Sequence, residues 1–211
     1  MQRLLKNREW LLAGIIIVMI AGFALRAPGF GRPGNLVNIF NDTSILIILA
    51  LGQMAVILTK SIDLSVAANL AFTGMAVAMT NAAFPGIPLP LLIAMAVGIG
   101  AFLGSINGIL VWWLGIPPIV VTLGTLTIYR GMAFVLSGGA WINAHQMSPT
   151  FLNVPRTPVL GMPVLSWVAI LMIAGAWLVL TRTSFGRSAY AAGSAQSAPS
   201  STRAVISPPA S

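Results

Sequence analysis

The sequence lacks cysteine altogether and has only one histidine and three acidic residues among 211. Without cysteine, disulfides, thiolate metal ligands and cysteine nucleophiles are excluded. The histidine is His145, in a predicted outer loop, and the acids are Glu9, Asp42 and Asp63, too few and too scattered for a catalytic pair or a metal site. We therefore expect neither an enzyme nor a protein with a metal ion or cofactor of its own.

Charge is scarce as well. Charged residues make up 7% of the chain and hydrophobic residues 57%, whereas a soluble domain would be about 25% charged. The eleven basic residues give a net charge of +8, but they are scattered between apolar runs and form no basic helix face. We expect them to flank helices that span a lipid bilayer, and we do not expect nucleic-acid binding.

Six long apolar runs indicate an all-α fold, a polytopic membrane bundle of about six helices, because lipid leaves backbone groups no partner outside their own helix. The runs cover residues 10–25, 36–59, 64–84, 89–114, 119–136 and 159–180. The first is a little short of the ~20 residues that usually span a membrane. Arg26 stands where a signal peptide would need a small residue, so we expect this helix to be retained.

The topology follows from the number of spans. We expect residues 1–9 in the cytoplasm, residues 10–180 in the bacterial inner membrane, and residues 181–193 in the cytoplasm again. Residues 194–211 contain six Ser, four Ala and three Pro, and this composition predicts a disordered tail. A phosphate-binding loop needs a Gly-Lys pair, which neither Lys6 nor Lys60 provides, so ATP-driven transport would require a separate ATPase subunit.

Small and polar residues mark several positions within the spans. Gly100, Gly104 and Gly108 form two overlapping G-x-x-x-G motifs, which predict close helix packing. Asp63 follows Lys60 at a junction between spans. It is either a polar element of a transport path or gate, or a cap that accepts hydrogen bonds near Ser65 at the start of the third helix.

Arg130 lies well inside the fifth apolar run. Either its guanidinium faces the bundle interior or a water-filled cavity, or the helix breaks near Gly131 and lets Arg130 reach the interface. Other polar residues in the spans either line a path for a solute or form hydrogen bonds between helices. The candidates for a translocation path or gate are Asp63, Asn69, Asn107, Thr122, Thr125 and Arg130.

Three stretches, in this order on six hydrophobic spans, resemble one family. They are SIDLSVAANLAFTGM at 61–75, NGILVWWLGIPPIVVTLGTLTIYRG at 107–131 and TRTSFGRSAYAAG at 181–193. The chain is identified as a member of the permease family of bacterial ATP-binding-cassette importers for ribose, xylose, rhamnose and autoinducer 2. Residues 41–65 and 141–149 resemble the rhamnose-type branch.

The resemblance implies a permease subunit that forms the translocation path with a second permease chain. A periplasmic binding protein would deliver the sugar, and cytoplasmic ATPase subunits would bind the ATP. The family's ATPase-coupling segment resembles residues 181–193, which implies coupling roles for Arg182, Gly186, Arg187, Ala192 and Gly193. Alternatively, Arg182 and Arg187 only anchor the sixth helix at the interface.

The chain departs from the family after Gly193, where the family continues its coupling segment and adds about four more spans. We expect a frameshift near codon 194, an incomplete permease domain and an out-of-frame tail. The alternative to a working subunit is therefore a truncated membrane remnant that inserts but does not couple to the ATPase.

Overall fold

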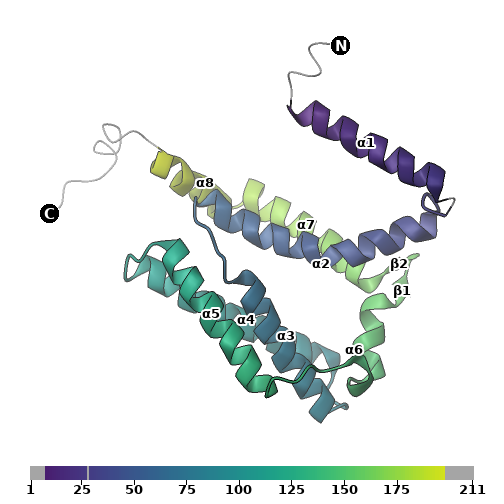
Figure 1. Ribbon diagram of the computed structural model, residues 1–211. Coiled ribbons are helices and arrows are strands. Elements are labelled where there is room, and N and C mark those ends of the chain that lie inside the picture. The colour runs from purple at the N-terminus through teal and green to yellow at the C-terminus, as the bar shows by residue number, and fades with distance from the viewer. Residues whose placement is uncertain (1–7, 28, 198–211) are drawn as a thin grey trace.

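The computed structural model describes residues 8–27 and 29–197, and these residues are almost entirely helical (Figure 1). The elements are α1 (Arg8–Arg26), α2 (Pro33–Leu58), α3 (Val66–Ala83), α4 (Leu89–Trp112), α5 (Pro118–Ser137), the 3-10 turn η1 (Ala144–Gln146), α6 (Pro149–Asn153), the 3-10 turn η2 (Val154–Arg156), β1 (Pro158–Val159), β2 (Met162–Pro163), α7 (Val164–Arg182) and α8 (Ser184–Ser197). The all-α fold class is thus confirmed.

Five of the described helices, α2, α3, α4, α5 and α7, are long and apolar enough to cross a membrane. The expected first span is a helix too, but its apolar part, from Trp10 to Arg26, is shorter than the others. Five of the six expected spans therefore meet this criterion of length and composition. Prolines mark the starts of α2, α4 and α5, since proline suits the first helical turn, where its missing N–H is not needed.

The helices form two packed groups. One group contains α3, α4 and α5, and the other contains α2 and α7, with α8 packed on α2 and α7 (Figure 1). In the first group Ala68, Leu103 and Tyr129 form a buried cluster. In the second, Ser166 donates a hydrogen bond to the side-chain oxygen of Asn41 at 3.3 Å. Helix α1 extends away from both groups, and most of its side chains are exposed.

Two connecting segments tie the groups together. The segment between α2 and α3 runs past Gln53, whose amide donates to the backbone oxygen of Asp63 at 2.7 Å. The segment between α5 and α7 is held by Asn81 of α3, which accepts from the backbone N–H of Ser148 at 2.8 Å and donates to its hydroxyl at 3.0 Å. Both Asn81 and Ser148 are buried, so neither can easily exchange these bonds for water.

The sixth span begins later than the sequence predicted. Residues 159–163 were expected in the helix, but they belong to a short antiparallel hairpin in which Pro158 pairs with Pro163. Leu160 and Gly161 form its turn with positive φ angles of 50° and 82°. Two successive positive φ angles close a two-residue hairpin. Helix α7 therefore starts at Val164, after Pro163.

The end of the chain is also more helical than predicted. The start of the coupling loop, residues 181–193, contains the end of α7 and most of α8, with only Thr183 between the two helices. Helix α8 continues to Ser197, four residues into the stretch expected to be disordered. The remaining part of that stretch, residues 198–211, and residues 1–7 at the other terminus lie outside the described residues.

Candidate functional site

A polar cluster surrounds Asp63 at the end of the bundle where α8 lies, here called the α8 end. One carboxylate oxygen of Asp63 accepts from the backbone N–H of Ser65 at 2.8 Å and from its hydroxyl at 2.7 Å. Ser65 precedes the first residue of α3. Asp63 therefore makes the contact that the capping interpretation predicted, and its negative charge lies near the positive end of the helix dipole.

The cluster reaches into α4 and α5. Asn107 of α4 donates to the hydroxyl of Ser65 at 2.7 Å. Thr122 of α5 donates to the backbone oxygen of Ile62 at 3.3 Å. These bonds gather the ends of α3, α4 and α5 at one place, although their residues lie up to 60 positions apart in the sequence. Of the predicted path residues, Asp63, Asn107 and Thr122 are thus brought together.

Two buried oxygens in this cluster have no hydrogen-bond partner within the described part of the chain. They are Oε1 of Gln53 and Oδ1 of Asn107. An unpaired buried acceptor costs about 1–3 kcal/mol. The cluster thus holds two acceptors that a donor such as water or a hydroxyl group would stabilise. Sequence patterns gave no reason to single out Gln53, an ordinary polar residue beside an apolar run, and pointed to Ser65 only as the place where Asp63 would cap the third helix.

The other predicted polar positions connect helices or bond within one helix. Asn69 of α3 donates to the backbone oxygen of Gly100 in α4 at 3.2 Å. Thr125 bonds only to carbonyls of its own helix, those of Val121 and Thr122. A further contact, from the Tyr129 hydroxyl to the Leu103 carbonyl at 2.8 Å, was not predicted. Asn69 therefore forms a hydrogen bond between helices, which was the alternative to a solute path, whereas Thr125 bonds only within α5.

The glycine motif of α4 is used at one of its three positions. Gly100 faces α3, where a Cβ would lie 3.9 Å from Oδ1 of Asn69. A Cβ at Gly104 or Gly108 would have no heavy atom of the described chain within 4 Å. Close helix packing at Gly104 and Gly108 stays a prediction, because no helix of the described residues lies against these two positions.

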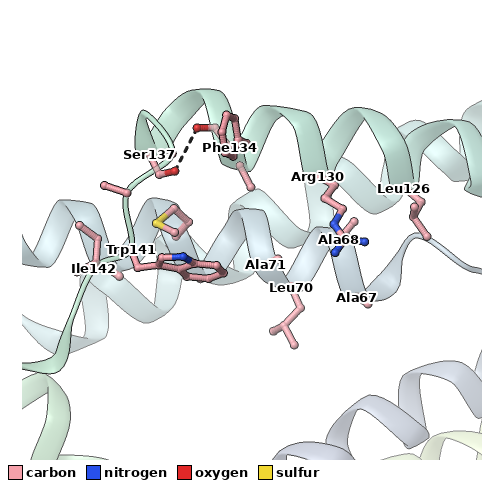
Figure 2. A pocket seen from close by; sticks show the side chains of 16 residues that line it. Ala67, Ala68, Leu70, Ala71, Leu126, Arg130, Phe134, Ser137, Trp141 and Ile142 are labelled. Atoms are coloured by element: carbon pink, nitrogen blue, oxygen red, sulfur yellow. Dashed lines mark hydrogen bonds between the residues drawn. The ribbon is translucent and has the colours of Figure 1, made fainter.

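A groove of about 660 Å³ lies along α3 and α5 (Figure 2). Its wall on α3 carries mostly small side chains, and Trp141 lies toward one end of it (Figure 2). The lining residues are Ala67, Ala68, Leu70, Ala71, Gly74, Met75, Ala78, Leu126, Arg130, Ala133, Phe134, Ser137, Gly139, Ala140, Trp141 and Ile142. Arg130 supplies the one charge in this lining, and in Figure 2 its guanidinium extends from α5 toward α3.

The structure tests one part of the two interpretations of Arg130. Helix α5 continues without a break from Pro118 to Ser137, so the predicted break near Gly131 is absent. Arg130 is exposed and lines the groove, and its contact with a water-filled cavity stays a prediction. Asn69 and Thr122 do not line this groove, so the predicted path residues fall into two separate places.

Helix α8 is seated by two of its glycines. A Cβ added at Gly186 would overlap the backbone carbonyl of Leu180 in α7, and one added at Gly193 would overlap that of Leu58 in α2. Ala189 is buried between them along the helix. Because any side chain larger than hydrogen would clash, Gly186 and Gly193 fix α8 against both longer helices.

Other side chains of α8 point outward. Phe185, Arg187, Tyr190 and Ala192 are all exposed, with 63% of Phe185 and 54% of Tyr190 accessible. Arg182, at the end of α7, lies over the ring of Trp177 at 5.8 Å from its centre, an arrangement typical of a cation–π contact. The five predicted coupling residues therefore divide into buried glycines and exposed residues, and prediction missed the two exposed aromatic side chains.

His145 lies in the 3-10 turn η1, exposed on the segment between α5 and α7. Among the described residues, no three His, Asp or Glu side chains form a group that could hold a metal ion. The two features with chemical character are thus the polar cluster at the α8 end and the groove at Arg130.

Comparison with known proteins identifies relatives over most of the chain. The family model for the branched-chain amino acid transport system / permease component matches residues 35–202. The autoinducer 2 import system permease protein LsrC of Yersinia enterocolitica is 40% identical over 189 residues, which cover 89% of this chain and 51% of that protein. The proteins of the same name from Yersinia pseudotuberculosis and Escherichia coli are 41% and 39% identical.

The matches also define how much of each relative the chain represents. They cover 89% of this chain in both further cases, but 52% of the Yersinia pseudotuberculosis protein and 54% of the Escherichia coli protein. The chain thus spans about half the length of the curated relatives it matches. No solved structure matches it. Since the family model covers well over half of the sequence, the chain belongs to the family of branched-chain amino acid transport system permease components.

Proposed function

We propose that the chain is a permease subunit of an ATP-driven importer for a sugar or for autoinducer 2. The relatives named above are autoinducer 2 permeases, and sequence resemblance predicts rhamnose among the sugars. The proposal places the chain in the bacterial inner membrane with its N-terminus and α8 in the cytoplasm. Its partners would be a cytoplasmic ATPase, a periplasmic binding protein and a second permease chain.

The observation that carries this proposal is the seating of α8. The helix lies across the ends of α2 and α7, fixed by the backbone contacts of Gly186 and Gly193. Under this proposal a displacement of α8 would pass to the long helices it touches, because the backbones are in close contact at Gly186 and Gly193. Its exposed face offers a partner Phe185 and Tyr190 for apolar contact and Arg187 for an acidic site.

The polar cluster links a displacement of α8 to the helices of the proposed transport path. Gln53 connects α2 to the Asp63 backbone, while Ser65 and Asn107 connect the same residue to α3 and α4. A displacement of the α2 end by α8 would therefore act on the bonds that hold the α3–α5 group. The unpaired oxygens of Gln53 and Asn107 could then exchange partners with water or with a solute hydroxyl.

A transport assay tests the proposal. The chain would replace LsrC in an Escherichia coli strain that retains the other components of the autoinducer 2 importer, and disappearance of autoinducer 2 from the medium would be followed. Uptake of radiolabelled rhamnose and ribose would be measured in strains that lack the corresponding permeases. Uptake of any of the three solutes above the permease-null background would support a working permease subunit. Absence of all three would contradict transport by this chain and favour the alternative, the incomplete membrane remnant.

A second assay separates a coupled permease from the alternative, a membrane remnant that inserts without coupling. The tagged chain would be purified in mild detergent from cells that contain the importer's ATPase subunit. A coupled permease retains the ATPase in stoichiometric amounts, whereas a remnant is recovered without it. A variant with Arg156→Ala provides a control, because Arg156 is exposed on the segment between α5 and α7 rather than on α8.

A further inference from the structure

We propose that two matching turns of the chain, residues 84–88 and 113–117, are embedded in the phospholipid interface, one in each leaflet of the membrane. The turns would contact the glycerol, ester and phosphate groups of the lipids rather than bulk water or a protein partner. Such a position goes beyond the proposed function, since it concerns how the bundle sits in lipid. It can be tested without any measurement of transport.

The first observation is that the two turns share a sequence pattern. Residues 84–88 read FPGIP and residues 113–117 read WLGIP, so each turn is an aromatic residue, one variable residue and then Gly-Ile-Pro. Their exposure matches position by position, because the isoleucine is half-buried and the other four residues are exposed. Each turn ends at the proline before a helix, Pro88 before α4 and Pro117 before α5. The same short apolar turn therefore occurs twice.

The second observation is the length of α4, the helix that separates the turns. Asn107 of α4 belongs to the polar cluster at the α8 end, so Trp112 lies at that end and Leu89 at the opposite one. The 24 residues of α4 are about 36 Å long at ~1.5 Å per residue, and a usual tilt of ~20° leaves a span of about 34 Å.

This span lies between the two thicknesses of a bilayer. The hydrocarbon core is about 30 Å thick, and the bilayer with its headgroup regions is about 40–45 Å thick. A membrane-spanning α4 therefore ends just outside the hydrocarbon on both sides, but short of bulk water. The two turns follow directly on these ends.

The third observation is that neither turn is suited to bulk water. No Asp, Glu, Lys, Arg or His occurs anywhere in residues 64–129. Even so, Trp113 and Leu114 in one turn and Phe84 in the other are 77%, 54% and 63% exposed. Large apolar side chains that stand free in a turn without charge gain free energy by leaving water.

The hydrocarbon core does not suit the turns either. The backbone N–H groups of Gly86 and Gly115 have no hydrogen-bond partner within the described part of the chain. The indole N–H of Trp113 has none there, whereas that of Trp167 donates to the Val159 carbonyl. Unpaired donors are costly in hydrocarbon. The interface provides acceptors beside an apolar layer, and aromatic side chains concentrate at that level.

An interfacial position of the turns also sets the depth of the polar cluster. Asn107 lies five residues before Trp112, which is about 8 Å inward along α4. The carboxylate of Asp63 is joined to Asn107 through Ser65. The cluster would then lie near the hydrocarbon boundary rather than in bulk water.

Spin labels on single cysteines test this position, because the chain has no cysteine of its own. P85C and L114C would each be labelled in the otherwise unchanged chain and reconstituted in vesicles of phosphatidylethanolamine and phosphatidylglycerol. Collisions of each label with oxygen, which concentrates in hydrocarbon, and with a water-soluble nickel chelate give its depth. F102C, at an exposed residue near the middle of α4, is the reference for hydrocarbon, and H145C, in the exposed turn η1, is the reference for water.

We expect the labels at residues 85 and 114 to lie about 15 Å shallower than the label at residue 102. They should also meet the nickel chelate less often than the label at residue 145. L91C and I119C change exposed residues in the helical turn that follows each turn and leave both turns intact. Their labels should lie between the depth of the turns and that of residue 102. They decide the question on their own if P85C or L114C fails to insert.

Three results would overturn the proposal. A label at residue 85 or 114 that meets the nickel chelate as often as the label at residue 145 would place that turn in water. A label as deep as the one at residue 102 would place the turn in the hydrocarbon. A label shielded from both reagents would show that protein, such as another copy of the chain, covers the turn.

Discussion

Gly193 of α8 lies against the backbone carbonyl of Leu58, the last residue of α2, with no space between them for a Cβ. Gly186 lies in the same way against Leu180 of α7. These two backbone contacts lie about two turns apart along α8, one on each side of Ala189. They hold a single short helix on the ends of two long ones. This seat makes α8 part of the bundle rather than a loose connection.

Replacement of either glycine should therefore loosen α8. In G193A, the added methyl group would force α8 away from Leu58, and overpacking of this kind costs about 1–3 kcal/mol. We expect faster proteolysis within residues 184–193 of the purified chain and a lower unfolding temperature in detergent. G186A should act in the same direction through Leu180.

The control is G175A. Gly175 lies inside α7, and a Cβ there would meet no heavy atom of the described chain within 4 Å. Alanine favours a helix over glycine by about 0.5–1 kcal/mol. G175A should therefore leave α8 protected and stability unchanged or slightly raised. If G175A loosened α8 as much as G193A does, the seat would not depend on the close backbone contacts.

Ser65 provides a second prediction, because it joins Asp63 to Asn107. Its hydroxyl donates to the Asp63 carboxylate and accepts from the Asn107 amide. S65A leaves the buried amide of Asn107 without an acceptor, which costs about 1–3 kcal/mol. We expect the midpoint of denaturant unfolding in detergent to fall accordingly.

S105A is the matched control for S65A. Ser105 lies on α4, as Asn107 does, but it is exposed and its hydroxyl bonds to the Ala101 carbonyl of its own helix. Its loss should change stability by less than about 0.5 kcal/mol. Equal effects of S65A and S105A would show that the connection through Ser65 does not hold the helices together.

The sequence predicted the long helices well, because lipid-compatible apolar runs and proline breaks leave few alternatives. The expected starts at Leu89 and Ile119 are within one residue of the observed ones at Leu89 and Pro118. The start at Val159 was wrong because apolarity alone does not distinguish a helix from a hairpin. There the deciding signal was Leu160-Gly161, whose positive φ angles turn the chain.

The candidate site was less predictable. Asp63 and Asn107 stand out in the sequence as polar exceptions in apolar surroundings, but nothing local shows that Ser65 bonds to both of them. Helix α8 was missed because glycine and serine are weak helix formers. Its helicity depends on contacts with Leu58 and Leu180, and such tertiary contacts lie beyond any single stretch of sequence.

Asn81 yields a third prediction. Its side chain forms two hydrogen bonds with Ser148 and so holds the segment before α6 against α3. N81A removes both bonds and leaves the Ser148 N–H buried without a partner, at a cost of about 1–3 kcal/mol. We expect faster hydrogen exchange at Ser148 and lower thermal stability. N153A, at the exposed end of α6, should leave both unchanged, and a similar loss in N153A would contradict the special role of Asn81.

The two faces of α8 give the last prediction, since they separate stability from partner binding. Phe185 and Arg187 are exposed, whereas the close contacts of α8 are formed by Gly186 and Gly193. Under the proposed function, F185A and R187A should lower the amount of ATPase that co-purifies by about tenfold each, a loss typical of an interface anchor. Because neither side chain contributes to the seat, the unfolding temperature of the isolated chain should stay within the error of the wild type. G193A should instead lower both quantities. If F185A and R187A lowered the unfolding temperature as much as G193A does, a partner-binding role for the exposed face would have no support. If all three variants kept the ATPase, the partner would dock elsewhere.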